Sequence, residues 1–290
     1  MQALVDLGLL SRKPRVGTVI ADLLALERIP WKIGVASITA AERGPLAFFA
    51  VLHHQIISKL LDFNCRTMTY LRRQPAHWPH EIGDFPGLHD SLHYGQLDGV
   101  IMMTNLNHDE WLNLDAQGTA VCHVGPFTDV RCGIVMDQSS FISEATQVLQ
   151  EAGCRRIDVA KMLQKEGSPP NTAATKQSFT VGMQELKDGQ AAAKALLERP
   201  LSERPDGIIA ADDYFAMGLA EELQRAGGDS IPQIACIANR QLPLSYALPV
   251  LRWEMDINLL AERAVALIQG RLLGRIGMDC VQYIQPVAVH

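Results

Sequence analysis

Short apolar runs alternate with longer segments of helical periodicity along most of the chain. Lys32–Ile38 is one such run, and in the following segment, Pro45–Phe63, apolar residues recur at the spacing of a helix face. Cys65–Leu71 is a second apolar run, suited to a second strand. Regular alternation of this kind predicts parallel sheets covered by helices.

The same alternation continues toward the C-terminus. Further strands are expected at Asp98–Met103, Thr119–Val124, Gly133–Met136, Arg156–Ala160, Gly207–Ala211 and Ile234–Ala238. Further helices are expected at Asp109–Leu114, Ser139–Glu151, Gln177–Lys187, Gln190–Leu197, Ala216–Ala226 and Asp256–Gly270. The stretch Gln164–Lys176 contains Gly167, Pro169 and Pro170 and predicts a loop.

The segment Pro205–Asn239 contains a complete strand, helix and strand, with two carboxylates where the first strand meets the helix. Asp212 and Asp213 are both helix-capping residue types. Small molecules bind open parallel sheets beyond the carboxyl ends of the strands, where Asp212 and Asn239 would both lie. We expect Asp212 to face a ligand and Asp213 to cap the helix.

Composition agrees with a globular protein of two lobes. The chain has 290 residues, of which 48% are hydrophobic and 20% charged. No apolar segment approaches the roughly 20 residues needed to span a bilayer, and Met1–Leu10 lacks the features of a secretory signal. These properties predict a cytoplasmic protein with no membrane partner.

The cysteines and histidines do not predict a metal site. The six cysteines are scattered without a CxxC pair, and the nine histidines do not complete a ligand set. Four cysteines stand in apolar, strand-like runs and are expected to be small buried side chains, namely Cys65, Cys122, Cys132 and Cys236. We therefore expect neither a metal nor a cofactor.

Sequence motifs of common enzymes on doubly wound folds are missing. The chain has no GxGxxG after a strand, no Walker loop, no GxSxG elbow and no HExxH. Asp212 and Asp213 are the one candidate acid/base pair, but adjacent residues at a strand end point to opposite sides. We predict no catalytic residues and a protein that is not an enzyme.

From Lys32 to His290 the order of elements resembles the effector-binding domain of the LacI/GalR family. Asp98-Gly-Val-Ile is similar to the family's DGLI strand, and the segment starting at Pro205, PDGIIAADDYFAMG, is similar to PDAIFAANDxxAxG. Pro249-Val-Leu-Arg-Trp resembles PPLTTVRQ, and the terminal Gln285-Pro-Val-Ala-Val-His stands for P-x-x-x-x-R.

This resemblance implies an α/β fold of two doubly wound parallel-sheet lobes, joined by three crossover segments. It is the periplasmic-binding-protein-like type I arrangement. The expected N-terminal lobe comprises residues 32–137 plus 254–272, and the C-terminal lobe comprises residues 138–253 plus 273–290. Residues 21–31 are expected to form a linker.

The first twenty residues carry a second resemblance. ALVDLGLLSRKPRVGTVI, which begins at Ala3, is similar to the end of a GntR-type winged helix, where a helix ends in LxxxGLL and a wing in GTxV. Residues 1–20 would then be the C-terminal remnant of a DNA-binding domain. The resemblance implies DNA contacts near the wing tip by Arg12, Lys13, Arg15 and Thr18. Operator DNA would be read only by a complete winged helix, and the remnant implies a fragment or a late start.

Ligand contacts are implied at positions that match the family's binding loops. They are Thr39, Glu42, Arg43, Phe179, Asp212, Asn239, Arg240 and Trp253. Phe179 and Trp253 would stack on a sugar, although Trp253 is equally suited to the core.

The departures from the family pattern affect the expected ligand. The usual RxxGF arginine is replaced by Phe179, whereas Arg240 stands where the family usually has an acid, and Lys176 is a second replacement candidate. A monosaccharide is the leading ligand, and a sugar acid bound by Arg43 and Arg240 is the alternative.

The resemblance implies a homodimeric GntR/LacI-type hybrid regulator. Its effector would drive lobe closure and so alter DNA binding. The dimer contacts are expected to involve Leu46–Leu61. The alternative function is a solute-binding protein of a sugar transporter, which shares the fold but needs an export signal.

Overall fold

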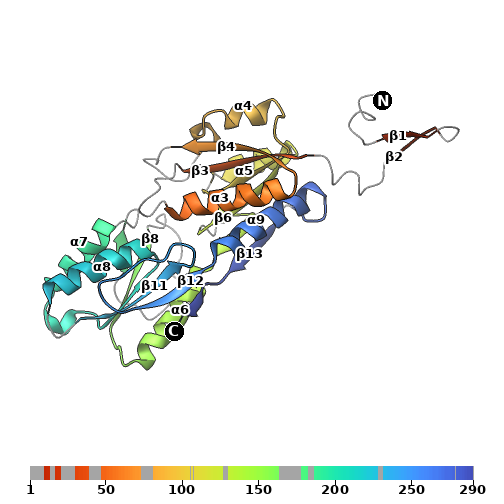
Figure 1. Cartoon of the computed structure of the whole chain (residues 1–290). Coiled ribbons are helices and arrows are strands. Elements are labelled where there is room, and N and C mark those ends of the chain that lie inside the picture. Colours follow the sequence, from red (N-terminus) through yellow and green to blue (C-terminus); the bar gives the residue numbers. More distant parts are fainter. Residues whose placement is uncertain are drawn as a thin grey trace.

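The described residues fold into two parallel-stranded lobes and a separate hairpin (Figure 1). The computed structural model describes residues 10–13, 17–20, 30–38, 47–72, 81–104, 106, 108–126, 130–162, 178–181, 186–227, 231–277 and 279–289. Each lobe is built on a six-stranded sheet.

The sheet of the first lobe is entirely parallel, in the order β13-β7-β6-β5-β3-β4. Its strands are β3 (Lys32–Ile38), β4 (Arg66–Arg72), β5 (Gly99–Met102), β6 (Ala120–Gly125), β7 (Cys132–Met136) and β13 (Cys280–Ile284). The central strands β5, β6 and β7 are buried along their whole length. This explains their apolar sequences, because strands of a covered parallel sheet meet helices on both faces.

Helices cover both faces of this first sheet. The helices α3 (Ala47–Asp62) and α9 (Ile257–Leu272) share a core cluster with β3 and β6. On the opposite face lie η1 (Ile82–Asp84), α4 (Leu88–His93) and α5 (His108–Ala116), around a second cluster. The first cluster continues into the second lobe, where it includes residues of α6 (Gln138–Glu151).

The second lobe has the strand order β14-β12-β11-β10-β8-β9. Its strands are β8 (Ile157–Met162), β9 (Ser178–Val181), β10 (Gly207–Ala210), β11 (Gln233–Asn239), β12 (Val250–Met255) and β14 (Val287–Val289). Only the pairing of β12 with β14 is antiparallel. One face packs on α6, and the other packs on α7 (Leu186–Leu197) and α8 (Asp213–Ala226), with a 3-10 turn η2 (Leu201–Glu203) before β10.

The chain passes between the lobes three times, through very short connections. Asp137 alone joins β7 to α6, and Asp256 alone joins β12 to α9. Gln285 and Pro286 join β13 to β14. Because β7, β12 and β13 each end at a connection, the carboxyl ends of the strands in both sheets lie toward the other lobe.

The last part of the chain differs from the sequence prediction. Residues 273–290 were expected in the second lobe, but β13 pairs in register with β7 in the first sheet. Only β14 joins the second sheet. This pairing could not be predicted from local periodicity, because it joins segments nearly 150 residues apart.

The predictions for residues 177–197 are corrected in part. The predicted helix Gln177–Lys187 is wrong, because Ser178–Val181 forms strand β9 beside β8. Thr180 and Val181 are β-branched, which favours a strand. The second expected helix, Gln190–Leu197, is confirmed as part of α7, which begins earlier, at Leu186, and contains Gly189.

Gly189 and Gly218 allow α7 and α8 to pack closely. A Cβ atom on Gly218 would overlap the carbonyl oxygen of Leu186, and one on Gly189 would overlap that of Phe215. The two backbones therefore touch at positions where no side chain fits.

The N-terminal hairpin consists of β1 (Leu10–Lys13) and β2 (Gly17–Ile20), which are antiparallel, with Arg12 opposite Thr18. Arg15 lies outside the described residues. This antiparallel backbone is the one expected for the wing of a winged helix. The resemblance to GntR-type domains stays a prediction.

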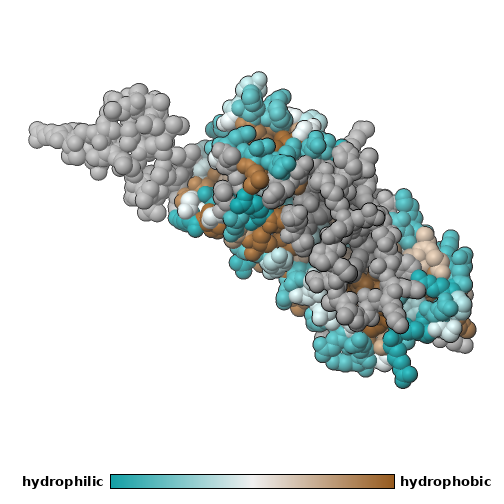
Figure 2. Space-filling model, turned by 180° about the vertical axis from the view of Figure 1, so that it is seen from behind, coloured by the Kyte–Doolittle hydropathy of each residue, from teal (hydrophilic) through white to brown (hydrophobic). Residues whose placement is uncertain are grey.

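Hydrophilic and hydrophobic residues are mixed on the surface of the described residues seen from behind, and hydrophobic ones gather on the first lobe (Figure 2). No helix in the described part of the chain is long and apolar enough to span a bilayer.

Candidate functional site

The candidate site lies at the carboxyl edge of the second sheet, where β10 and β11 end. The strand β10 ends at Ala210 and leads into α8, and β11 ends at Asn239. The two strands are parallel neighbours, so their ends bring Asp212, Asp213 and Asn239 together. Asn239 donates its side-chain Nδ2 to Asp213 Oδ2 at 2.8 Å.

Asp212 has the capping role that the sequence predicted for Asp213. Asp212 is the N-cap of α8, and its carboxylate accepts a hydrogen bond from the Phe215 backbone N–H at 2.9 Å. Asp213 is only 3% exposed and is tied to Asn239. The prediction that Asp213 caps the helix is wrong because Asp212, with its extended backbone, holds the N-cap position, and Asp213 is already the first helical residue.

Burial makes both carboxyl groups weaker acids than an ordinary aspartate. Desolvation raises the pKa of Asp212, and the charge of Asp213 raises it further. Desolvation also raises the pKa of Asp213, against the hydrogen bond from Asn239, which lowers it. The pair therefore holds protons more tightly than exposed aspartates do, since two close carboxylates in a buried site resist ionising together.

A buried acceptor completes this polar group. Asn239 Oδ1 is buried and has no hydrogen-bond partner among the described residues. Leaving such an atom unpaired costs about 1–3 kcal/mol. A ligand hydroxyl or amine that donates to this oxygen would recover part of that free energy.

Sequence reasoning missed two further polar groups next to this site. Cys236, in β11, and the half-buried Tyr246 approach each other, with Sγ and OH 3.6 Å apart. Burial raises the pKa of Cys236 to about 12, and it also raises the pKa of Tyr246. The charge of Asp213 acts on both groups in the same direction, which places them near the aspartates.

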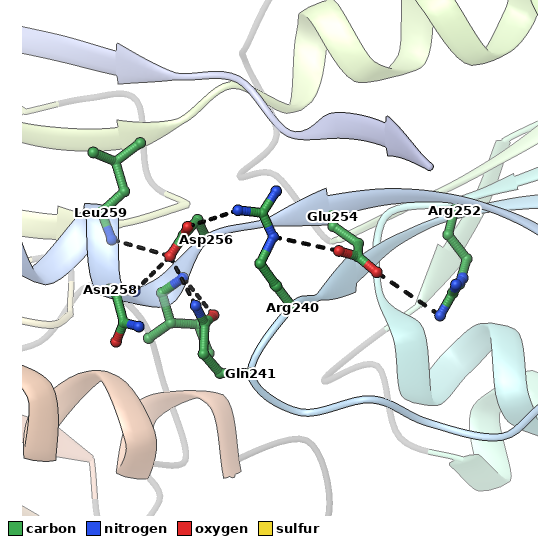
Figure 3. A network of polar contacts seen from close by, with 8 residues as sticks. Arg240, Gln241, Arg252, Glu254, Asp256, Asn258 and Leu259 are labelled. Atoms are coloured by element: carbon green, nitrogen blue, oxygen red, sulfur yellow. Dashed lines mark hydrogen bonds and ion pairs between the residues drawn. The ribbon is translucent and has the colours of Figure 1, made fainter. Parts of the chain in front are cut away.

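Arg240 points to the crossover at Asp256 and not to the aspartate pair. Its Nη1 donates to Asp256 Oδ2 at 2.8 Å, and its Nε lies 3.4 Å from Glu254 Oε2 (Figure 3). Arg252 approaches the other oxygen of Glu254 at 3.8 Å. The carboxylates of Glu254, in β12, and of Asp256, directly after β12, thus balance the positive charge of Arg240.

Asp256 organises the start of α9 at this crossover. It accepts hydrogen bonds from the backbone N–H groups of Asn258 and Leu259, and from Gln241 Nε2 at 2.8 Å. Gln241 Oε1 in turn accepts from the Ile257 N–H at 2.8 Å. An aspartate directly before an apolar periodic segment is a sequence signal for an N-cap, and it could have identified Asp256.

Trp253 is a core residue. It is 2% exposed, and its ring meets that of Phe141 edge to face at a centroid distance of 5.4 Å. Its Nε1 has no hydrogen-bond partner among the described residues. Of the two interpretations of this tryptophan, the structure supports packing in the core.

The remaining predicted contacts are not brought into the site. Thr39, Glu42, Arg43 and Lys176 lie outside the described residues. Phe179 lies on the edge strand β9, opposite Ala160, and its side chain is not described. Within the described ranges, no group of three or more His, Cys, Asp or Glu side chains is placed to hold a metal ion.

Two lobes with the carboxyl ends of their strands facing each other, joined by three crossovers, define the periplasmic-binding-protein-like class of ligand-binding folds. The chain is 37% identical over 89 residues to the lactose operon repressor of Rhizobium radiobacter, which covers 30% of this chain and 77% of that protein. This chain belongs to the LacI/GalR family of transcription regulators. It is the effector-binding part of such a regulator. No family model matches the chain.

Solved structures share the same fold. A lac repressor dimer bound to operator and the anti-inducer ONPF has a TM-score of 0.70 at 13% identity, covering 94% of this chain and 98% of that one. The Cra transcriptional dual regulator of Pseudomonas putida in complex with fructose 1-phosphate has a TM-score of 0.66 at 15% identity, covering 89% and 97%. These relatives are transcription regulators.

Proposed function

We propose that this regulator senses a small polyhydroxylated molecule bound between the carboxyl edges of its two sheets. The observation that carries the proposal is the acceptor-rich group formed by Asp212, Asp213 and Asn239. Asn239 Oδ1 is buried there, and no described residue donates a hydrogen bond to it. A buried acceptor without a donor favours a ligand that brings a hydroxyl group to it. Sugar ligands named for structural neighbours support the same class.

The position of Arg240 favours a neutral monosaccharide over a sugar acid. A sugar acid would need a guanidinium aimed at its carboxylate, but Arg240 is held by Asp256 and Glu254. Breaking those contacts would cost part of the binding free energy. The carboxylate of this pair that is ionised would in addition repel an anionic group.

Binding would act through the crossovers. An effector that contacts both lobes favours the closed arrangement by its differential affinity for that arrangement. Asp137 and Asp256 are the connections that must accommodate closure, because each ends a strand of one lobe and caps a helix of the other. Closure would move the first lobe and the N-terminal segment that precedes β3.

The same proposal includes a homodimer that carries DNA-binding heads. The strand β4 is an edge of the first sheet, and it exposes Met68 and Leu71. Leu61 and Phe63, at the end of α3 and just beyond it, are 57% and 56% exposed. Apolar side chains along an unpaired edge suit an interface between copies, which would extend the predicted contact segment Leu46–Leu61 to β4. Operator contacts by Arg12, Lys13, Arg15 and Thr18 belong to the complete winged helix of the hybrid.

A thermal-shift screen with neutral monosaccharides and sugar acids tests the ligand. A specific ligand at 100 times its dissociation constant stabilises the protein by about 2.7 kcal/mol. The informative variant is Asp212→Asn, since asparagine also caps helices but has no charge. It should abolish or strongly reduce the shift, while the unliganded melting temperature stays close to that of the wild type.

Asp90→Asn is the matched control, because the Asp90 side chain is 77% exposed on α4 in the other lobe. It should leave the ligand shift intact. A ligand shift of wild-type size in Asp212→Asn would place the binding site elsewhere.

A further inference from the structure

Three cysteines occupy the same level on three adjacent strands of the first sheet. Cys280 of β13 is the register partner of Cys132 of β7. Cys122 precedes His123, whose partner is Gly133, so Cys122 is level with Cys132. Register partners of parallel strands project from the same face. All three thiols accordingly belong to or pack against one apolar cluster.

The spacing of this cysteine row permits one disulfide at a time. Neighbouring strands lie about 4.7–4.9 Å apart. That spacing falls within the Cα–Cα range of about 4.4–6.8 Å found in disulfides. Cys122 and Cys280 are two strands apart, which is too far. Cys132 can therefore pair with either neighbour, and all six cysteines are thiols in this structure.

Polar contacts hold Cys132 and Cys280 beside each other. Arg131 Nε donates to Asp279 Oδ1 at 2.7 Å, and these residues directly precede the two cysteines. The Cys280 backbone N–H donates to the Arg131 carbonyl at 2.9 Å. The ion pair and the backbone bond fix the starts of β7 and β13 in register.

Exposure distinguishes the members of the row. Cys122 is 0% exposed and Cys132 is 1% exposed, whereas Cys280 is partly exposed. A dissolved oxidant therefore reaches Cys280 first.

We propose that Cys280 and Cys132 form an oxidation-sensitive pair, which hydrogen peroxide converts to a disulfide that ties β13 to β7. The Cys280 sulfur attacks one peroxide oxygen, the O–O bond breaks, and the second oxygen leaves as water with the thiol proton. Cys280 is then a sulfenic acid. The Cys132 sulfur attacks the Cys280 sulfur, the S–O bond breaks, and the hydroxyl leaves as water with the Cys132 proton. Two thiols lose two electrons in total, and one peroxide is reduced to two waters.

The bond would secure an edge strand that leads to a crossover. Among the described strands, β13 pairs only with β7, and these strands continue into Gln285 and Asp137. The Asp137 backbone N–H donates to the Ile284 carbonyl at 2.9 Å, so the same two strands also meet at the crossovers. Oxidation would stop β13 from separating from β7 at the N-terminal ends of the two strands, and the disulfide would thereby stabilise two of the three interlobe connections.

Peptide mapping of the full chain after treatment with hydrogen peroxide tests the proposal. Trypsin cleavage at Arg131, Arg155 and Arg275 releases one peptide that starts at Cys132 and another that contains Cys280. The expected product is these two peptides joined, with the loss of two hydrogen atoms. Cys154 lies in the same peptide as Cys132, so fragmentation must assign the bond.

Three variants complete the test, each first shown by its melting curve to be folded. Cys280→Ser should lose the crosslink, whereas Cys122→Ser should keep it. In Cys132→Ala the Cys280 sulfenic acid has no thiol to attack it, so dimedone should label Cys280 several-fold more than in the wild type. A bond from Cys280 to another cysteine, a Cys122–Cys132 bond, or sulfinic acid at Cys280 without crosslinking would each refute the proposal.

Discussion

Asn239 donates its side-chain amide to the buried carboxylate of Asp213 at 2.8 Å, joining the end of β11 to the first turn of α8. The contact lies where two neighbouring parallel strands end. It lowers the pKa of Asp213, against the larger effect of burial, which raises it. The hydrogen bond from Asn239 thus favours the ionised form of Asp213, which burial disfavours.

Asn239→Asp should make stability strongly dependent on pH. The change replaces a donor by a third carboxyl group, which raises the folded-state pKa values of the cluster further above those of the unfolded chain. For such acids the stabilisation is full below the unfolded pKa of about 4 and is lost as the pH rises through the folded pKa. The loss of unfolding free energy relative to the wild type should therefore be larger at pH 8 than at pH 5.

Urea unfolding at the two pH values measures this difference. Asn113→Asp is the control, because Asn113 is exposed on α5, far from the cluster in sequence. Equal losses for Asn239→Asp at both pH values would show that the variant acts through packing and not through protonation.

Gly218→Ala should destabilise the second lobe by about 1–3 kcal/mol, the usual cost of overpacking. The new methyl group would overlap the carbonyl oxygen of Leu186, which belongs to the backbone of α7 and cannot rotate away. Gly83→Ala is the matched control, since a Cβ there meets nothing within 4 Å. Chemical denaturation of both variants measures the difference, and equal stability would contradict the close approach of α7 and α8.

Trp253→Ala should lower stability by about 3–5 kcal/mol, because it opens a cavity beside Phe141. Trp253→Phe should cost less, since it keeps an aromatic ring and removes the indole N–H that lacks a partner among the described residues. The affinity of Trp253→Phe for an effector, measured by calorimetry, should match that of the wild type. A large loss of affinity with little loss of stability would restore Trp253 as a ligand contact.

Met68→Glu combined with Leu71→Glu should shift the protein from dimer toward monomer, by placing like charges along β4 of both copies. Sedimentation velocity over a range of concentrations measures the change. Leu201→Glu is the control, because Leu201 is 64% exposed but belongs to the second lobe. Monomeric wild-type protein at high concentration, or an unchanged dimer in the double variant, would argue against this interface.

Local sequence patterns predicted the strands that are buried on both faces. Gly207–Ala211 was expected as a strand and β10 spans Gly207–Ala210, because a strand covered on both faces must be a continuous apolar run. The segment Ser178–Val181 was predicted as a helix, but it forms strand β9 because it pairs with β8. Edge strands of four residues give little periodicity to interpret.

The candidate site was predicted in position but not in detail. The carboxyl edge was expected to gather Asp212 and Asn239, and it does so through the parallel order of β10 and β11. The division of roles between the aspartates depends on which residue starts α8. The partners of Arg240 come from β12 and its end, 14 and 16 residues away, and no local pattern identifies them.

The three crossovers have a consequence for how this protein can be divided. The first sheet needs β13 and the second needs β14, so each lobe is assembled from stretches that are discontinuous in the gene. No single truncation releases an intact lobe. Expressing residues 32–136 alone would leave β7 without β13 and α3 without α9. If the chain were divided at Asp137, neither fragment would contain a complete lobe, and the two fragments would have to associate in order to fold. Asp137 is therefore a suitable position at which to divide the chain for a fragment-complementation assay.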